Sequence, residues 1–131
     1  MPKTIQQLVE FDGVSPEKLF EIYIDSKKHS AAINAKAIIN PGVGGEFKAF
    51  EGNVHGKNLF ILPKQIIVQT WRAQPWKEND PDSILILIFS KTTDGGRIEL
   101  VQANVPDHAY NIINDGWETQ YWKPWKNYLR Q

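Results

Sequence analysis

The stretch that decides the fold reads Gly116-Trp117-Glu118-Thr119-Gln120-Tyr121-Trp122-Lys123-Pro124-Trp125-Lys126-Asn127-Tyr128-Leu129. Together with the residues that precede it, this stretch predicts one long amphipathic helix over residues 107–129. Large apolar side chains recur there at intervals of three or four and therefore share one face: Ile113, Trp117, Tyr121, Trp125 and Tyr128. Each such ring can bury about 150–250 Å². We expect this helix to cover the apolar face of a sheet.

Pro124 lies inside the predicted helix. A proline has no backbone N–H, so it removes the bond to the carbonyl of Gln120, and we expect a kink at this point. A kinked helix on a concave sheet leaves space beneath it, which hints at a pocket.

Most of the chain before this helix predicts strands. A strand over residues 3–11 is followed by a helix that starts at Ser15-Pro16, with Ser15 as its N-cap, and by a second short helix from Ser26 to about Asn34. Six further strands are predicted over residues 35–40, 46–51, 54–62, 65–72, 83–90 and 96–105.

The connections between these strands indicate how they pair. Residues 52–53, 63–64 and 94–95 have the length of two-residue hairpin turns, and no helix separates the strands, so the sheet is antiparallel. Asp107 is expected to cap the final helix. The predicted fold is α+β in the order β-α-α-β6-α, with a curved antiparallel sheet wrapped around a long C-terminal helix.

The composition narrows the class of protein. The 131 residues suit one domain over residues 1–131, and fifteen basic residues balance fifteen acidic ones. This neutral balance gives no electrostatic reason to expect nucleic acid or an anionic membrane as a partner. The sequence has no cysteine, no apolar run typical of a signal peptide and no stretch long enough to span a membrane. We therefore expect a cytoplasmic protein.

An ordered set of motifs resembles a known family. The motifs are Gly44-Gly45-Glu46-Phe47, Phe50-Glu51-Gly52-Asn53-Val54-His55-Gly56, Leu62-Pro63-Lys64-Gln65-Ile66-Ile67-Val68-Gln69-Thr70-Trp71-Arg72, Pro75-Trp76, Val105-Pro106, Gly116-Trp117 and Tyr121-Trp122. Together they resemble the activator of Hsp90 ATPase homologue family, which belongs to the START-like superfamily, also called SRPBCC or helix-grip. The resemblance covers residues 15–129.

The resemblance implies both a fold and two functions. It implies a long C-terminal helix gripped by a curved sheet, with a small hydrophobic ligand held between them. In the eukaryotic co-chaperone the matching domain is the second of two and contacts Hsp90, so a chaperone of the Hsp90 type is the alternative partner. The 131 residues contain no counterpart of the Asn-Asn-Trp-His-Trp stretch that is tied to activation. The resemblance assigns no catalytic residue and no cofactor.

Strand alternation places candidate ligand-binding residues on the inner face of the sheet. Ile98, Leu100, Gln102 and Asn104 are expected to face inward because Glu99, on the other side, is costly to bury. The predicted ligand-binding residues are Trp71, Gln102, Trp117, Tyr121, Phe89 and Leu100. The competing interpretation is that Gln102 bonds to the helix or to a water and that the rings belong to the core.

Two other tryptophans are candidates for contact with a partner protein. Trp76 lies in a polar loop, where it either folds back on the sheet or anchors a contact, and Trp122 lies off the main face of the helix, where it would extend an exposed patch. The histidines His29, His55 and His108 are too widely spaced for a helical metal site. An enzyme of the cyclase or hydratase kind rests on analogy of fold alone.

Overall fold

The structure is a computed structural model that describes residues 1–130. Its strands and first helices are β1 (Lys3–Asp12), α1 (Pro16–Ile24), α2 (Ser26–Ile33), β2 (Ala37–Ile39), β3 (Glu46–Ala49), β4 (Val54–Leu62), β5 (Ile66–Ala73), β6 (Ser83–Lys91) and β7 (Gly95–Val105). A C-terminal helical region follows, made of the 3₁₀ turn η1 (Asp107–Ala109), α3 (Tyr110–Gly116), the π-helix η2 (Trp117–Trp122) and α4 (Lys123–Leu129).

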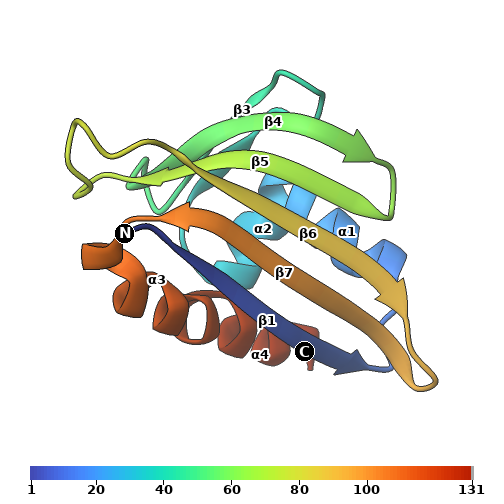
Figure 1. Cartoon of the computed structure of the whole chain (residues 1–131). Coiled ribbons are helices and arrows are strands. Elements are labelled where there is room, and N and C mark those ends of the chain that lie inside the picture. Colours follow the sequence, from blue (N-terminus) through green and yellow to red (C-terminus); the bar gives the residue numbers. More distant parts are fainter. Residues whose placement is uncertain (131) are drawn as a thin grey trace.

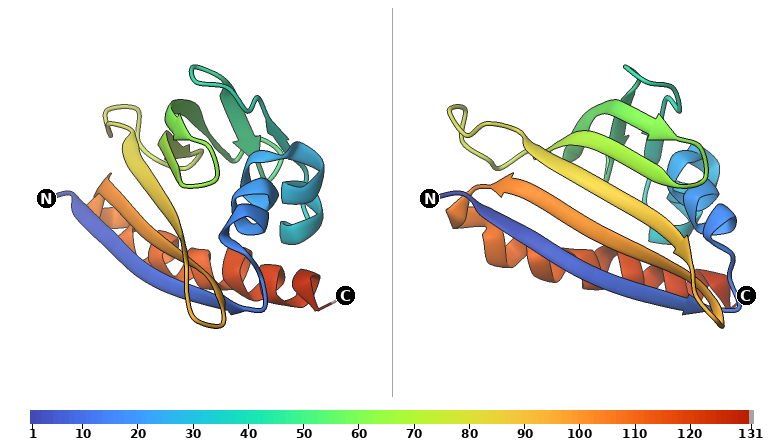
Figure 2. Two further views of the ribbon diagram at one scale, coloured as in Figure 1. Left: turned by 90° about the vertical axis from the view of Figure 1, so that its right-hand side faces the viewer. Right: turned by 45° about the vertical axis from the view of Figure 1, so that its right-hand side comes forward.

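Within the described residues, seven strands form one antiparallel sheet in the order β1-β7-β6-β5-β4-β3-β2. The first strand therefore pairs with the last, and every other pair is formed by neighbours in sequence. Figures 1 and 2 show the curved sheet, with the C-terminal helical region running alongside β1 and β7. Because α1 packs against β6 and β7 and α2 packs against β2 and α4, the helices gather on one side. The predicted α+β helix-grip fold is confirmed.

The inner face of the sheet follows the expected alternation. In β5, Ile67, Gln69 and Trp71 are buried, and in β6 the same holds for Leu85 and Leu87. Side chains of a strand alternate between its faces, so these residues all point at the helices. The intervening residues of β5 and β6 are half-buried on the outer face.

The alternation breaks near the end of β7. Asn104 was expected to face inward, but it adopts a φ of 66° and is only half-buried, whereas Val105 is fully buried. The pairing with β1 shifts register at this point, between Lys3 and Ile5. A bulge inserts an extra residue into one strand and so exchanges the faces beyond it.

The hairpin connections are longer than the two residues predicted. Strand β3 ends at Ala49 because Phe50 and Glu51 both have positive φ, at 53° and 58°, and turn the chain toward β4. Lys64 likewise has a φ of 67° between β4 and β5. Left-handed residues close these turns.

The helix caps are partly as predicted. The side chain of Ser15 accepts from the backbone N–H of Lys18 at 3.2 Å, which confirms it as the cap of α1. Asp107 was expected to cap the last helix, but no side-chain cap is formed there within residues 1–130. Its carboxylate instead lies 3.1 Å from the Nζ of Lys3 on the adjacent strand.

The C-terminal region is not the single α-helix that its periodicity predicted. A π-helical segment lies just before Pro124, and the N–H of Lys123 bonds to the carbonyl of Glu118, five residues back. The ring of Pro124 would collide with the carbonyl of residue 120 in an α-turn, and the wider turn accommodates it. No helix in the described part of the chain has the length and apolar composition to cross a bilayer.

The wide turn corrects the prediction for Trp122. An α-helix would turn its side chain away from the main face, but here it is only 2% exposed, and its ring stacks on that of Trp117, five residues earlier, with centroids 5.6 Å apart. Its Nε1 donates to the Oε1 of Gln7 at 2.9 Å. Trp122 is therefore a core residue and cannot extend an exposed patch.

This burial predicts a large loss of stability on truncation. Trp122→Ala should lower the free energy of unfolding by about 3–5 kcal/mol, because it removes a buried ring and leaves a cavity. Chemical denaturation measures the change. Ile112→Ala, at a position that is 75% exposed in the same helical region, is the control and should cost under about 0.5 kcal/mol. A loss of less than about 1 kcal/mol for Trp122→Ala would contradict this placement.

Candidate functional site

A cavity of about 440 Å³ lies between the start of the C-terminal helical region and one end of the sheet. Its floor comes from the end of β5, one side from the turn between β3 and β4, and the other side from the loop of residues 74–82 and from α3. Its walls are formed by Phe50, Asn53, Val54, Trp71, Ala73, Pro75, Trp76, His108, Ala109, Ile112, Ile113, Gly116, Trp117, Gln120 and Tyr121.

The deepest walls of the cavity are aromatic. Trp71 stands between two other indoles, with ring centroids 5.7 Å from Trp76 and 6.0 Å from Trp117. Tyr121 adjoins Trp117 at 4.7 Å, and Phe50 meets Tyr121 edge-on at 5.9 Å. Four of these rings, all but Phe50, are almost fully buried. Such a surface suits a flat apolar molecule.

The structure brings together three of the six predicted ligand-binding residues. Trp71, Trp117 and Tyr121 line the cavity. Leu100 is buried elsewhere on the inner face of the sheet, and Phe89 packs edge-on against Phe20 of α1 at 5.5 Å. Neither side chain lines the cavity, and both belong to the hydrophobic core.

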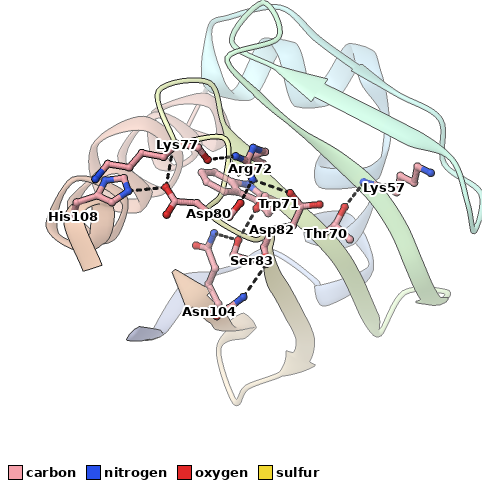
Figure 3. A network of polar contacts seen from close by, with 11 residues as sticks. Lys57, Thr70, Trp71, Arg72, Lys77, Asp80, Asp82, Ser83, Asn104 and His108 are labelled. Atoms are coloured by element: carbon pink, nitrogen blue, oxygen red, sulfur yellow. Dashed lines mark hydrogen bonds and ion pairs between the residues drawn. The ribbon is translucent and has the colours of Figure 1, made fainter. Parts of the chain in front are cut away.

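Gln102, the third predicted residue outside the cavity wall, is bonded at both ends of its amide. Its Oε1 accepts from the Nε1 of Trp117 at 2.8 Å, and its Nε2 donates to the Oγ of Ser83 at 3.0 Å. Ser83 in turn donates to the carbonyl of Trp71 at 2.7 Å, a bond visible in Figure 3. Gln102 thus positions Trp117, and its side chain is not part of the cavity wall.

Trp76 folds back from its loop onto the sheet. Its side chain is only 7% exposed and packs on Trp71, and the guanidinium of Arg72 lies 6.0 Å from its ring. Of the two arrangements that the sequence left open, the structure has the folded-back one. The ring forms one wall of the cavity instead of an exposed anchor for a partner protein.

A network of polar contacts ties the loop of residues 74–82 to the C-terminal region (Figure 3). The guanidinium of Arg72 donates to the carbonyls of Asp80 and Lys77 and lies 3.3 Å from the carboxylate of Asp82. His108 donates from Nε2 to the carboxylate of Asp80 at 2.7 Å. This bond, foremost among several contacts, holds the pKa of the Asp80 carboxyl below its usual value. His108 therefore fastens one wall of the cavity, a role that its sequence context did not indicate.

A buried chain of hydrogen bonds runs from the cavity wall into the core. The carbonyl of Tyr23 can only accept, so the His29 Nδ1 at 2.7 Å carries the proton. The unprotonated Nε2 then accepts from the Tyr121 hydroxyl at 3.0 Å. The hydroxyl of Tyr23 donates to Gln69, whose amide donates to Asn58, both at 2.9 Å. The chain joins α1, α2, β4 and β5 to the C-terminal region.

Burial shifts the pKa values of the titratable side chains in this hydrogen-bonded series. It raises the pKa of the hydroxyls of both Tyr23 and Tyr121 and lowers the pKa of His29 from 6.5 to about 4, although the bond to the Tyr23 carbonyl opposes this shift. His29 was missed at the level of sequence. A signal existed, because His29, Ala32 and Ile33 are spaced as one buried helix face.

The cavity wall carries few titratable side chains. Among the lining residues described, the titratable side chains are His108 and Tyr121, and no carboxylate or cysteine accompanies them. Residues 1–130 contain no group of three or more His, Cys, Asp or Glu side chains placed to hold a metal ion. The exposed His55, on the other side of the β3–β4 hairpin, does not reach the cavity.

Comparison with known proteins points to one family. The family model described as "Activator of Hsp90 ATPase homolog 1-like protein" matches residues 13–130. The relative from Dictyostelium discoideum named activator of 90 kDa heat shock protein ATPase homolog is 25% identical over 116 residues, which are 88% of this chain and 30% of the relative. The human homolog 1 of the same name is 27% identical over 83% of this chain and 32% of its own length. The chain thus spans about a third of these relatives.

Solved structures share the fold. An Hsp90 activator from Plasmodium falciparum superposes with a TM-score of 0.86 at 22% identity and covers 99% of this chain and 96% of that one. A protein from Mesorhizobium loti superposes with a TM-score of 0.82 at 21% identity, over 98% and 97% of the two chains. At these identities the likeness is one of fold.

The buried histidine predicts a pH-dependent stability. Unfolded His29 binds a proton near pH 6.5 and folded His29 only near pH 4. Between these values the unfolded state holds more protons, so the free energy of unfolding falls as the pH falls. The loss from His29 reaches about 3 kcal/mol by pH 4.

Chemical denaturation of wild type and His29→Gln between pH 7 and pH 4 measures this effect. The destabilisation caused by the substitution at pH 7 should shrink by about 3 kcal/mol at pH 4, because glutamine does not titrate. The exposed His55→Gln is the matched control and should follow the wild-type curve. Parallel curves for wild type and His29→Gln would show that His29 is not held neutral in the core.

Proposed function

The chain belongs to the family of activator of Hsp90 ATPase homolog 1-like proteins, and from that premise we propose that it is a binding module that holds a small hydrophobic ligand between its sheet and its C-terminal helical region. The observation that carries this proposal is the aromatic-walled cavity of about 440 Å³. Sites for small molecules usually measure about 300–1,000 Å³ and are lined by apolar groups with a few polar ones. The predicted residues Trp71, Trp117 and Tyr121 supply the apolar wall.

Gly116 supports the same proposal. It lies in the helical region with φ −62° and ψ −32°, a conformation open to any residue. Apart from its chain neighbours and the backbone of its own helix, a Cβ placed on it would meet no described atom within 4 Å. Neither backbone geometry nor packing therefore requires glycine here. Alanine would stabilise the helix by about 1 kcal/mol. The missing side chain leaves the wall of the cavity open.

The proposal predicts that a side chain added at this wall blocks binding. Wild type should bind the uncharged fluorescent probe N-phenyl-1-naphthylamine, and Gly116→Leu should weaken that binding by about tenfold or more, because leucine occupies the volume of a probe ring. A fluorescence titration measures both affinities. Asn111→Leu adds the same side chain at an exposed position of the same helix and should bind as wild type does.

Stability separates a blocked cavity from a damaged fold. Gly116→Ala should raise the free energy of unfolding by about 0.5–1 kcal/mol, because it lowers the entropy of the unfolded chain without a clash. Wild type that leaves the probe free, or a Gly116→Leu variant that is folded and binds it unchanged, would contradict the proposal.

A second candidate function is contact with a chaperone of the Hsp90 type. The relatives' names motivate it, and the outer face of the sheet supports it. Val68 of β5, Ile86 of β6 and Val101 of β7 pair across neighbouring strands and form a half-buried apolar row on that face, and Ile84 and Ile88 flank Ile86. No helix covers this face among the elements drawn in Figure 1. Apolar surface of this kind tends to mark contacts between proteins.

Introducing a charged side chain into this apolar row tests whether the outer face contacts a chaperone. Capture of an Hsp90-type chaperone by the immobilised protein should fall by about tenfold or more in Ile86→Lys, because an uncompensated charge would be buried in the contact. Ile38→Lys, at a 56% exposed position on β2, is the matched control and should retain capture. Equal capture by both folded variants, or none by wild type with and without nucleotide, would count against a chaperone contact at this face.

A further inference from the structure

A strained turn forms one side of the cavity. Between β3 and β4 the chain passes through three successive residues with positive φ, which are Phe50 at 53°, Glu51 at 58° and Gly52 at 90°. Glycine adopts this region freely, but in other L-residues the Cβ lies too close to the following carbonyl oxygen, and a bulky residue there is a clear outlier. Phe50 therefore costs conformational energy that a glycine at the same position would not.

The other left-handed residues in the described part of the chain show how unusual Phe50 is. Asn34 and Asn104 carry the side chain that tolerates this region best after glycine, and Glu51 and Lys64 are exposed and polar. Phe50 is the aromatic member of this set, and it is half-buried. Strained residues of this kind cluster at ligand clamps and other functional sites, so the ring at this position calls for a role.

The ring of Phe50 lies against the cavity wall. It meets the ring of Tyr121 edge-on, with centroids 5.9 Å apart, and both residues line the cavity. Among the five aromatic rings of the wall, Phe50 alone keeps an intermediate exposure, because the other four are almost fully buried in the core. The stabilisation from covering apolar surface scales with the area removed from water. A ligand in the cavity therefore gains more from covering Phe50 than from touching a ring that is already buried.

Hydrogen bonds hold the turn in its strained conformation. The N–H of Gly52 donates to the carbonyl of Ala49 and the N–H of Asn53 donates to the carbonyl of Phe50, both at 3.1 Å. The N–H of Gln74 donates to the carbonyl of Asn53 at 2.7 Å and so joins the turn to the loop that follows β5. Strain persists only where the surrounding structure over-determines the conformation, and these bonds do so. They fix the ring of Phe50 beside the cavity.

Resting on the proposed function, we infer that Phe50 is a ligand-contacting residue whose ring covers an apolar, ring-bearing molecule in the cavity, and that the left-handed turn of residues 50–52 holds the ring in place. The contact is between apolar surfaces, and aromatic rings add a preference for edge-on or offset packing. Phe50 was not among the ligand-binding residues predicted from the sequence, because a residue in a turn belongs to no strand or helix period.

Two glycine variants of the same turn test this inference in a fluorescence titration with N-phenyl-1-naphthylamine. Phe50→Gly removes the ring and suits the backbone, so it should bind the probe about tenfold more weakly than wild type, because one ring contact is missing. Glu51→Gly makes the same backbone change at the next position, where the side chain is exposed and does not line the cavity. It should bind as wild type does. Chemical denaturation establishes that both variants are folded.

Nuclear magnetic resonance of wild type supplies a measurement that needs no loss of the ring. In protein labelled with ¹³C in its phenylalanine rings, the ring protons of Phe50 should show nuclear Overhauser effects to the ring protons of the bound probe. The signals of Phe50 are assigned by their absence in Phe50→Tyr, which keeps an aromatic ring in the turn. Phe89, which packs against Phe20 and does not line the cavity, is the internal control and should show no such effect.

The outcomes separate the inference from the function on which it rests. Weaker binding by Phe50→Gly, unchanged binding by Glu51→Gly and Overhauser effects between the probe and Phe50 support the inference. Unchanged binding by a folded Phe50→Gly, an equal loss in Glu51→Gly, or a bound probe without contact to Phe50 overturns it and leaves the hydrophobic binding function standing. If Phe50→Gly does not fold, the Overhauser effects decide. If wild type does not bind the probe, both the inference and the proposed function fail.

Discussion

The structure depends on the π-helical turn at residues 117–122, which brings two successive aromatic residues into one core. In an α-helix, Tyr121 and Trp122 would point in clearly different directions, but with a bond from Lys123 back to Glu118 the turn holds one more residue. Trp122 then stacks on Trp117, while Tyr121 and Trp125 fill the remaining space at centroid distances of 6.0 and 5.5 Å from it. The sheet curves around the helical region that carries this cluster, as the ribbons in Figure 2 show.

The same core buries polar side chains, and each of these is hydrogen-bonded: His29, Asn58, Gln69, Ser83 and Gln102. Gln69, Asn58 and His29 connect the helices to the sheet, and Gln102 connects Trp117 to Ser83. Such fully bonded networks favour one arrangement of the helices, because any shift would leave a buried polar group unsatisfied.

The cavity lies at the start of the C-terminal helical region, where side chains do not fill the space between this region and the sheet. The loop of residues 74–82, fastened by Arg72 and by the bond from His108 to Asp80, folds Trp76 inward and forms one wall. Gly116 adds no side chain to the opposite wall. Two segments far apart in sequence thus define a single space, and the ligand proposal follows from that arrangement.

The sequence by itself determined the class of fold, because alternation along the strands, the cap at Ser15 and the aromatic periodicity of residues 113–128 are local patterns that survive in the structure. It also identified Trp71, Trp117 and Tyr121, since strand and helix periods place them on inward faces. Only the tertiary structure decided the pairing of β1 with β7, the π-turn that buries Trp122, the bulge that turns out Asn104, the partner of Gln102 and the role of His108. Each of these features depends on contacts between residues on different strands or helices. The periodicity of side chains along one segment carries no information about such contacts.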